Sequence, residues 1–376
     1  MHKKAADWCP EAGRRRQDKR SSQVSDEGQL SLRKAESRRR SATRAVTMAD
    51  VAQAAGVSTQ TVSRALRDPR SVGPDTLARI EEAVRETRYV QNLAASHLAS
   101  NRSMTVAAII PTISASIFAE TIQGLTDVLL PEGYQVFLGH TDYMAGREES
   151  LVRSFSGRRP DGFFIIGTRH TQETTALLKR TGVPVVESWS WTNRPVDMLV
   201  GFSNHAALMS VVDHLVERGY RRLAFTGVMK PGDHRAKERL KGFQDAHERH
   251  FPGVTPRVVT VASGPMVMAT GVELLKLVRE QHPDTDALVF VSDVLASGAL
   301  LACSGLGISV PKDLAITGFG NYDIAGQLTP GLTTIAIASR KIGMESANLL
   351  LRRMQGGEVE NRTQDVGFEL LVRGSA

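Results

Sequence analysis

The sequence has few cysteines and no long apolar run, and each absence excludes a class of protein. Its 376 residues include only two cysteines, Cys9 and Cys303, which lie far apart, so a disulfide framework is excluded and a reducing, cytoplasmic location is expected. No run of about 18 uninterrupted apolar residues occurs, so no membrane-spanning helix is expected. The start of the chain has no apolar stretch behind its charges and therefore does not resemble a secretory signal. Hydrophobic residues make up 41% of the chain, enough for sizeable cores, which excludes a wholly disordered protein.

The excess positive charge is confined to the N-terminal end. Residues 1–46 hold 13 Lys/Arg against 6 Asp/Glu, whereas residues 104–376 hold 27 against 28. Because residues 1–46 also lack apolar periodicity, we expect a disordered basic tail, whose arginine clusters at 14–16 and 38–40 could add non-specific phosphate contacts. A basic arm before a neutral body points to nucleic acid. Two alternatives remain open for the tail, an idle solvated extension or a start codon assigned upstream of the real one.

Residues 47–66 have the pattern of two short helices that share one buried face. Thr47 and Ser58 each precede a helical run and can cap it, and Gly56 falls where the turn between the helices needs positive φ. The apolar residues at helical spacing are Val51, Ala52, Ala55, Val57, Val62 and Leu66. The outward residues of the second helix are short and polar, as a helix in the major groove of DNA requires, and they are Thr59, Gln60, Ser63 and Arg64.

A third helix is expected to complete this small domain. It begins at Gly73-Pro74-Asp75, where proline suits the first turn, and it packs through Leu77, Ile80 and Val84. Together the three helices predict an all-α helix-turn-helix headpiece.

The combined pattern resembles the DNA-binding headpiece of the lactose/galactose repressor (LacI/GalR) family. The matching stretches are T-M-A-D-V-A-x-x-A-G-V-S-x-x-T-V-S-R from Thr47, R-Y-V-Q-N at 88–92 and L-A-A-S-H-L-A at 93–99. The resemblance implies a headpiece at 47–91 and a hinge helix at 92–103. It implies base and phosphate contacts by Ser58, Thr59, Gln60, Thr61, Ser63 and Arg64. It also implies phosphate contacts by Tyr89 and Asn92, and insertion into the minor groove by the hinge residues Ala95 and Leu98.

Two residues depart from the pattern of this family. Gln91 stands where a proline is usual, which loosens the start of the hinge. Gly73 replaces a usual serine cap, a mild change because glycine is tolerated at that position.

Beyond residue 103, short apolar runs alternate with amphipathic segments. The strand-like runs are 106–110, 135–139, 162–166, 183–187, 199–202, 223–226, 258–261, 288–291 and 314–317, and helix-like segments include 118–130, 206–218 and 237–249. This alternation predicts parallel sheets covered on both faces, with ligand at the carboxyl ends of the strands. Residues 104–376 resemble an α/β two-lobed periplasmic-binding-protein-like core with two parallel, doubly wound sheets. The sequence ends without leucine heptads, so a homodimer is expected rather than a zipper-joined tetramer.

Five residues of this core are candidates for contact with a small-molecule effector. Asp293 follows the run 288–291, and Arg239 opens an R-L-x-G-F motif with a guanidinium suited to a carboxylate or vicinal hydroxyls. Arg235 lies one helical turn earlier if the helix extends that far. Phe118 matches a pocket-lining aromatic residue of the family, and Glu187 ends its own run. For each, a solvated charge or a packed side chain is the alternative.

Three further stretches, at 200–204, 316–324 and 365–368, resemble the gluconate-operon repressors within the family. This resemblance implies gluconate or a related sugar acid as effector, with its carboxylate on Arg239 or Arg235. A regulator of another sugar or of a purine pathway is the alternative.

The sequence contains no nucleophile elbow, phosphate-binding loop or dinucleotide fingerprint in a suitable context, so we expect no enzyme and no cofactor. Gly318-Phe319-Gly320 is interpreted as a turn after a strand. His247 and His250 could share a metal ion, but no third ligand is evident, so a solvated helix face is favoured and no metal is expected.

The function expected is a dimeric repressor that binds a near-palindromic operator and is released by an inducer, although a corepressor response stays open. The alternative function is a sugar-binding sensor without DNA binding, which would require that the polar side chains at 59–64 do not contact DNA.

Overall fold

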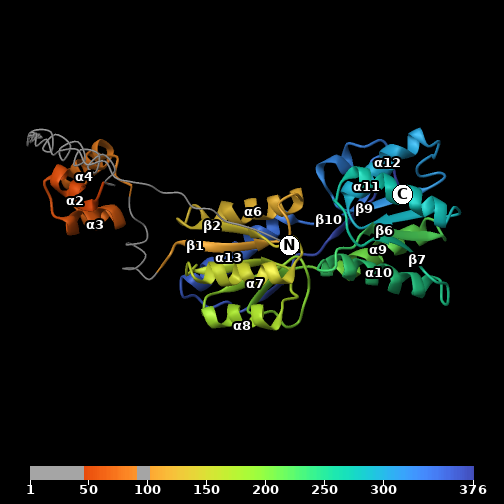
Figure 1. The fold of residues 1–376 in the computed structure, drawn as a ribbon, viewed down its shortest axis with the longest axis horizontal. Coiled ribbons are helices and arrows are strands. Elements are labelled where there is room, and N and C mark those ends of the chain that lie inside the picture. Colours follow the sequence, from red (N-terminus) through yellow and green to blue (C-terminus); the bar gives the residue numbers. More distant parts are fainter. Residues whose placement is uncertain (1–45, 91–101) are drawn as a thin grey trace, which may run out of the picture. The chain divides into compact units, whose positions relative to one another are not determined.

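The structure, a computed structural model, describes residues 46–90 and 102–376, and the chain divides into the units Met1–Asn92 and Leu93–Ala376. The described part of the first unit is helical (Figure 1). Its elements are α2 (Met48–Ala55), α3 (Thr59–Arg67), the 3-10 helix η1 (Pro69–Ser71) and α4 (Pro74–Thr87). The tail and nearly all of the expected hinge helix lie outside the described residues.

The helices of the first unit begin at the predicted residues, and the first of them ends at the predicted turn. The Asp50 carboxylate accepts hydrogen bonds from the backbone N and Oγ1 of Thr47, both at 2.7 Å. Ser58 Oγ accepts a hydrogen bond from Thr61 N at 3.1 Å, and Gly56 adopts φ 64° between the helices. Val51, Val62 and Ile80 are fully buried in one small core. These caps, the turn and the shared apolar face confirm the predicted helix-turn-helix.

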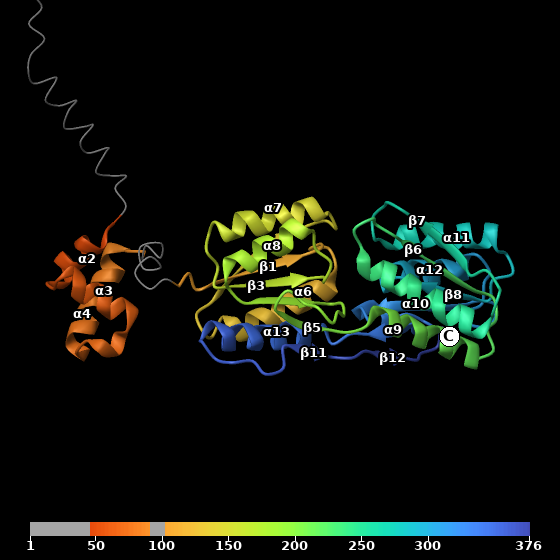
Figure 2. The same cartoon turned by 90° about the horizontal axis from the view of Figure 1, so that it is seen from below.

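The first lobe of the second unit is built on a parallel six-stranded sheet. Its strand order is β11-β5-β4-β3-β1-β2, with β1 (Thr105–Ile110), β2 (Gln135–His140), β3 (Gly162–Ile166), β4 (Val185–Ser188), β5 (Met198–Gly201) and β11 (Thr363–Asp365). Helices α7 (Ala145–Ser156) and α8 (Gln172–Thr181) cover one face, and α6 (Ser116–Leu129) and α13 (Ser339–Met354) cover the other (Figure 2). Alternate residues of β1 pack into these two cores, since the strand is buried on both faces.

The second lobe repeats this plan with one difference. Its strand order is β12-β10-β9-β8-β6-β7, with β6 (Leu223–Val228), β7 (Arg257–Val261), β8 (Ala287–Phe290), β9 (Ala315–Gly320), β10 (Thr333–Ala336) and β12 (Glu369–Leu371). The edge strand β12 is antiparallel to β10, and the other pairs are parallel. Its helices are α9 (Asn204–Glu217), α10 (His234–His250), α11 (Met268–Gln281), α12 (Asp293–Gly305) and the 3-10 helix η2 (Asp323–Gly326).

The chain crosses between the lobes three times. It leaves the first lobe after β5, returns from β10 to α13, and crosses again from β11 to β12. Each lobe is therefore assembled from segments that are distant in sequence.

All nine strand-like runs correspond to strands, and the two-lobed α/β fold is confirmed. The interpretation of Gly318–Gly320 as a turn was wrong, because these residues form the end of β9, and the Phe319 side chain is buried. The short strands β10, β11 and β12 were not predicted. In the described part of the chain, no helix is long and apolar enough to cross a membrane.

Candidate DNA-binding surface and ligand cleft

The exposed face of α3 carries the predicted DNA-contacting side chains. Ser58, Thr59, Gln60 and Arg64 are exposed, and Thr61 and Ser63 are partly buried. Within residues 46–90, the side chains of Thr59, Gln60 and Arg64 form no hydrogen bond or ion pair. Helix α3 also carries Arg64 and Arg67 and no acidic residue in its first turn. This face therefore offers unengaged donors and positive charge to an anionic partner.

The remaining predicted DNA contacts divide between described and undescribed residues. Tyr89 is half-buried and packs against the core of the headpiece. Asn92, Ala95 and Leu98 lie outside the described residues.

A cavity of about 260 Å³ lies between the two lobes at the carboxyl ends of their strands. The first lobe contributes residues that follow β1 and β2, among them Thr112, Phe118 and Tyr143. The second lobe contributes residues from α10 and from the ends of β8 and β9, and these include Arg235, Arg239, Ser292, Phe319 and Tyr322. The predicted candidates Phe118, Arg235 and Arg239 are therefore brought together.

Arg239 is held in one orientation by the second lobe. Its Nε donates to Asn204 Oδ1 at 2.9 Å, its Nη1 donates to the Val291 carbonyl at 2.8 Å, and its guanidinium carbon lies 3.6 Å from the centroid of the Phe319 ring. Burial lowers the pKa of Arg239 to about 10, with partial compensation from the charge of Asp233. Among the described residues, Arg239 forms no salt bridge, so a buried cation stands in the cleft without a directly bound carboxylate.

Arg235 lies one turn before Arg239 on α10, as expected. Its guanidinium carbon is 5.4 Å from the Phe118 ring centroid and 5.9 Å from that of Tyr143. Its Nη2 is 3.8 Å from Asp233 Oδ1, beyond hydrogen-bond length. Burial, followed by the charge of Asp233, raises the pKa of Tyr143 to about 12, so its hydroxyl is neutral and available as a donor.

Two other charged residues of the cleft, Lys230 and Asp142, form an ion pair, and Asp233 lies beside the two arginines. Lys230 Nζ lies 3.0 Å from Asp142 Oδ1. Asp233 caps α10 by accepting from Ala236 N at 3.2 Å. The cavity therefore has a net cationic centre at its two arginines.

Two predicted effector residues are placed outside the lining of this cavity. Asp293 is fully buried, and its carboxylate accepts from Thr334 Oγ1 at 2.6 Å and from Tyr322 N at 2.8 Å. Burial raises the pKa of Asp293 to about 6 despite these hydrogen bonds. In this arrangement Asp293 supports the loop that carries Tyr322 of the cavity wall.

Glu187 belongs to a buried charged cluster in the first lobe. His170 Nδ1 lies 2.7 Å from Glu148 Oε1, and His170 Nε2 lies 3.2 Å from Glu187 Oε1. Burial opposes a charge on this imidazole, but hydrogen bonds to both carboxylates raise the pKa of His170 to about 9. Glu187 also accepts a hydrogen bond from Val196 N.

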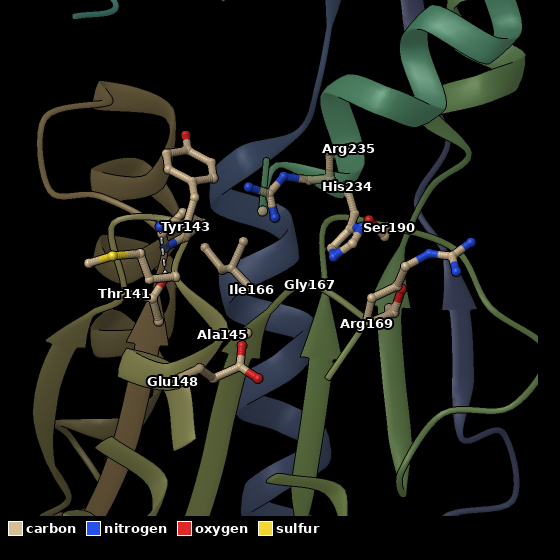
Figure 3. A pocket seen from close by; sticks show the side chains of 14 residues that line it. Thr141, Tyr143, Ala145, Glu148, Ile166, Gly167, Arg169, Ser190, His234 and Arg235 are labelled. Atoms are coloured by element: carbon tan, nitrogen blue, oxygen red, sulfur yellow. Dashed lines mark hydrogen bonds between the residues drawn. The ribbon is translucent and has the colours of Figure 1, made fainter. Parts of the chain in front are cut away.

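A second, smaller cavity of about 50 Å³ adjoins the cleft (Figure 3). Arg235 and His234 reach it from the start of α10, and Tyr143, Glu148 and Arg169 reach it from the first lobe. Because Tyr143 and Arg235 line both cavities, the two form neighbouring parts of one inter-lobe region.

His247 and His250 are engaged separately. The buried His247 ring packs between Phe243 and Phe251, with ring centroids 5.9 and 5.1 Å away. His250 Nε2 lies 2.6 Å from Asp213 Oδ1. Among the described residues, no group of three or more His, Cys, Asp or Glu side chains is arranged so that it could hold a metal ion.

Known protein families match both the helix-turn-helix headpiece and the two-lobed core that contains the cleft. The model of lacI-family bacterial regulatory proteins matches residues 47–92, and that of the periplasmic binding protein-like domain matches residues 212–376. The HTH-type transcriptional regulator GntR of Pseudomonas aeruginosa is 34% identical over 88% of this chain and 95% of its own length. The chain belongs to the lacI family.

Further similarities extend over the same part of this LacI-family chain. The HTH-type transcriptional repressor CytR of Escherichia coli is 32% identical over 88% of the chain and 96% of its own length. The crystal structure of a LacI-family transcriptional regulator from Silicibacter pomeroyi superposes with a TM-score of 0.82 at 33% identity, over 88% of this chain and 99% of that chain. The protein is thus a DNA-binding transcriptional regulator of a family whose members are not enzymes.

Several residues of the cleft in this LacI-family regulator were not predicted from the sequence. Tyr143 and Asp233 lie in loops, and Tyr322 follows β9, so no periodic pattern marks them. Asn204 was noted only as part of a subgroup stretch, although its amide contacts Arg239.

Proposed function

We propose that this LacI-family regulator represses an operon for the utilisation of gluconate or a related sugar acid, and that the sugar acid releases it from DNA. The observation that carries the proposal is the buried Arg239, which has no salt bridge among the described residues. A buried charge is costly unless it is paired, so a ligand carboxylate would complete the site. The resemblance to gluconate-operon repressors and the similarity to a regulator named GntR support this choice.

In the proposed complex, the ligand carboxylate binds Arg239 or Arg235, and the sugar hydroxyls face Tyr143, Ser292 and Tyr322. Phe118 forms an apolar wall. Asp293 acts from behind the cavity wall, because its carboxylate holds Thr334 and Tyr322, and Glu187 acts within the first lobe through His170.

On DNA, the regulator acts as a homodimer that places two α3 helices in successive major grooves of a near-palindromic operator. Thr59, Gln60 and Arg64 contact base edges and phosphates, supported by Ser58, Thr61 and Ser63. Tyr89 and Asn92 contact phosphates, and Ala95 and Leu98 enter the minor groove between the half-sites.

The ligand assignment is tested by thermal unfolding with D-gluconate, D-glucose and adenosine. A ligand at 100 times its Kd stabilises the native protein by about 2.7 kcal/mol. We expect a shift with gluconate alone. A shift with glucose or adenosine alone would overturn the sugar-acid assignment while leaving the family intact.

The role of Arg239 is tested with the variant Arg239→Met. Arg373 is a matched control, because its Nη2 donates to Asn321 Oδ1 at 2.8 Å and its Nη1 to the Leu332 carbonyl at 2.7 Å, in the same lobe but outside the cavity lining. Arg239→Met is expected to weaken gluconate binding about 100-fold, near the upper limit for charge-assisted hydrogen bonds. Arg373→Met is expected to keep the parent affinity. Equal gluconate affinity in both variants would contradict the assignment.

The regulatory step is tested by measuring gluconate affinity with and without operator DNA. If gluconate weakens operator binding, operator must weaken gluconate by the same factor. Equal affinities in the two conditions would exclude the proposed release.

A further inference from the structure

Asn204 is a buried amide that joins the ligand-facing arginine to the opposite lobe. It is fully buried at the first residue of α9, directly after the chain leaves β5 of the first lobe. Its Nδ2 donates to the Trp189 carbonyl at 2.9 Å, and its Oδ1 accepts from Arg239 Nε at 2.9 Å. Both ends of one amide are thus engaged, one in each lobe.

Trp189 connects this amide to the wall of the cleft in the first lobe. Its side chain is fully buried, its Nε1 donates to Thr121 Oγ1 of α6 at 3.1 Å, and its ring meets the ring of Phe118 edge-on at 5.1 Å. Its backbone adopts φ 66°, a region that bulky residues rarely occupy, so surrounding contacts must hold it. The hydrogen bond from Asn204 is one of those contacts.

On the other side, Asn204 sets the plane of the Arg239 guanidinium. The hydrogen bonds from Nε to Asn204 and from Nη1 to Val291 fix two edges of the group above the Phe319 ring. Without Asn204, one of these two bonds is lost, and the guanidinium can rotate about the other.

A second set of contacts runs beside the amide. The buried ring of Phe202 lies 6.0 Å from that of Trp189 and 6.4 Å from that of Phe319. The preceding residue, Gly201, packs so closely that a Cβ would lie 2.0 Å from the Ser190 carbonyl oxygen. The chain is therefore closely packed on both sides of Phe202, next to the amide of Asn204.

We propose that Asn204 is a positioning residue that orients Arg239 for an anionic ligand and transmits a displacement of Arg239 to Trp189. Trp189 passes the displacement to Thr121 of α6, which packs on α13. The role of Asn204 in ligand binding rests on the proposed function, whereas the Arg239–Trp189 coupling does not require gluconate as the ligand.

The coupling is tested in the full-length protein with Trp189 as the only tryptophan, after Trp8→Phe and Trp191→Phe. Without ligand, Arg239→Met is expected to shift the Trp189 emission maximum. In the background Asn204→Ala, the same substitution is expected to produce less than half of that shift. Such a double-mutant cycle separates coupling from a purely structural effect of either change.

The matched control is Thr226→Val, which removes a buried hydrogen bond to the Val259 carbonyl at 2.8 Å in the same lobe, whereas the hydrogen bonds of Arg239 go to Asn204 and Val291. In this background Arg239→Met is expected to produce the full shift. An equal shift with and without Asn204, or no shift in the parent, would overturn the proposal.

Titration with D-gluconate forms the second part of the experiment. Asn204→Ala is expected to weaken gluconate binding about 10-fold, and Thr226→Val less than 2-fold, since a hydrogen bond to a charged group is worth about a factor of ten or more. If gluconate fails to bind the parent while the double-mutant cycle shows coupling, the gluconate assignment falls and the coupling through Asn204 stands. If gluconate binds the parent and Asn204→Ala equally, the positioning role is wrong.

Discussion

The polar face of α3 comes from five residues of one short segment, 59–64, whereas the cleft combines residues from position 112 to position 322. On α3 the side chains of Thr59, Gln60 and Arg64 project from a frame set by local caps. At the cleft, Arg239 in the lining and Asp293 behind it already hold other groups of the protein. The headpiece can therefore change its contacts without rearranging its fold, while the cleft cannot.

Substitutions on the α3 face should therefore affect DNA binding alone, whereas substitutions at the cleft should affect both ligand binding and the stability of the fold. An exposed side chain without partners contributes little to folding. A buried hydrogen-bonded charge contributes to the fold, to the position of its neighbours and to the ligand at once. Four predictions extend the contrast.

The largest expected effect is a change with pH in the free energy of unfolding of the second unit, Leu93–Ala376, without a matching change in the headpiece. Because the pKa of His170 is raised to about 9, its contribution is fully present below the unfolded value of 6.5 and is lost as pH rises through 9. The expected loss is up to about 3 kcal/mol, because a tenfold change in proton affinity corresponds to about 1.4 kcal/mol. Denaturant unfolding of residues 102–376 within the full chain, between pH 6.5 and 9.5, measures it.

The variant Glu148→Gln serves as the comparison for this pH dependence. It keeps a hydrogen-bond acceptor near His170 Nδ1 and removes one of the two charges that favour the imidazolium. The loss of unfolding free energy over the same pH range is expected to shrink. An unchanged slope would show that His170 is not its source.

The next effect concerns sequence discrimination by α3. Gln60→Ala removes an exposed amide, and a bidentate contact to a base is worth about 1–3 kcal/mol of discrimination. We expect reduced preference for the operator over single-base variants, measured by competition binding at fixed salt, with no change in gluconate affinity. Unaltered discrimination would argue against the groove assignment.

A smaller effect is expected at the cap of the same helix. Ser58→Ala removes the acceptor for Thr61 N and should destabilise the headpiece by about 1 kcal/mol. Hydrogen exchange of the α3 amides reports this local change. The exchange of amides in β1 and β6 should stay as in the parent, and parallel changes there would contradict the independence of the two units.

The smallest effect is a gain in stability at the start of α4. Gly73 adopts φ −65° and ψ 149°, which any residue accepts, and no atom lies within 4 Å of the position a Cβ would take. Gly73→Ser should add a cap and stabilise the headpiece by a few tenths of a kcal/mol. A destabilised headpiece in thermal unfolding would show that the usual serine is not favourable here.

The helix-turn-helix could be predicted because its signals are local. Thr47, Ser58 and Gly56 each act on residues within four positions, so their roles are visible in the order of the sequence. The central strands were also predictable, because strands buried on both faces are continuous apolar runs.

The edges of the sheets and much of the cleft could not be predicted in this way. Strand β11 is three residues long and partly exposed, and it is a strand only because β5, more than 160 positions earlier, pairs with it. Arg235 and Arg239 were found through a helical motif, whereas Tyr143 and Asp233 reach the cleft through the meeting of two lobes. Gly318–Gly320 looked like a turn because glycine usually marks one, but pairing with β10 keeps it extended.

The three crossings between the lobes also have a consequence for the order in which the protein forms. A chain is synthesised from its N-terminus, and a domain folds once all of its segments are present. The segment 47–87 contains all four described helices of the headpiece, so the ribosome releases that domain complete and early. The first lobe requires α13 and β11, which are made after nearly every strand of the second lobe. During translation, the surface that would bind DNA can therefore form well before the lobe that completes the ligand cleft.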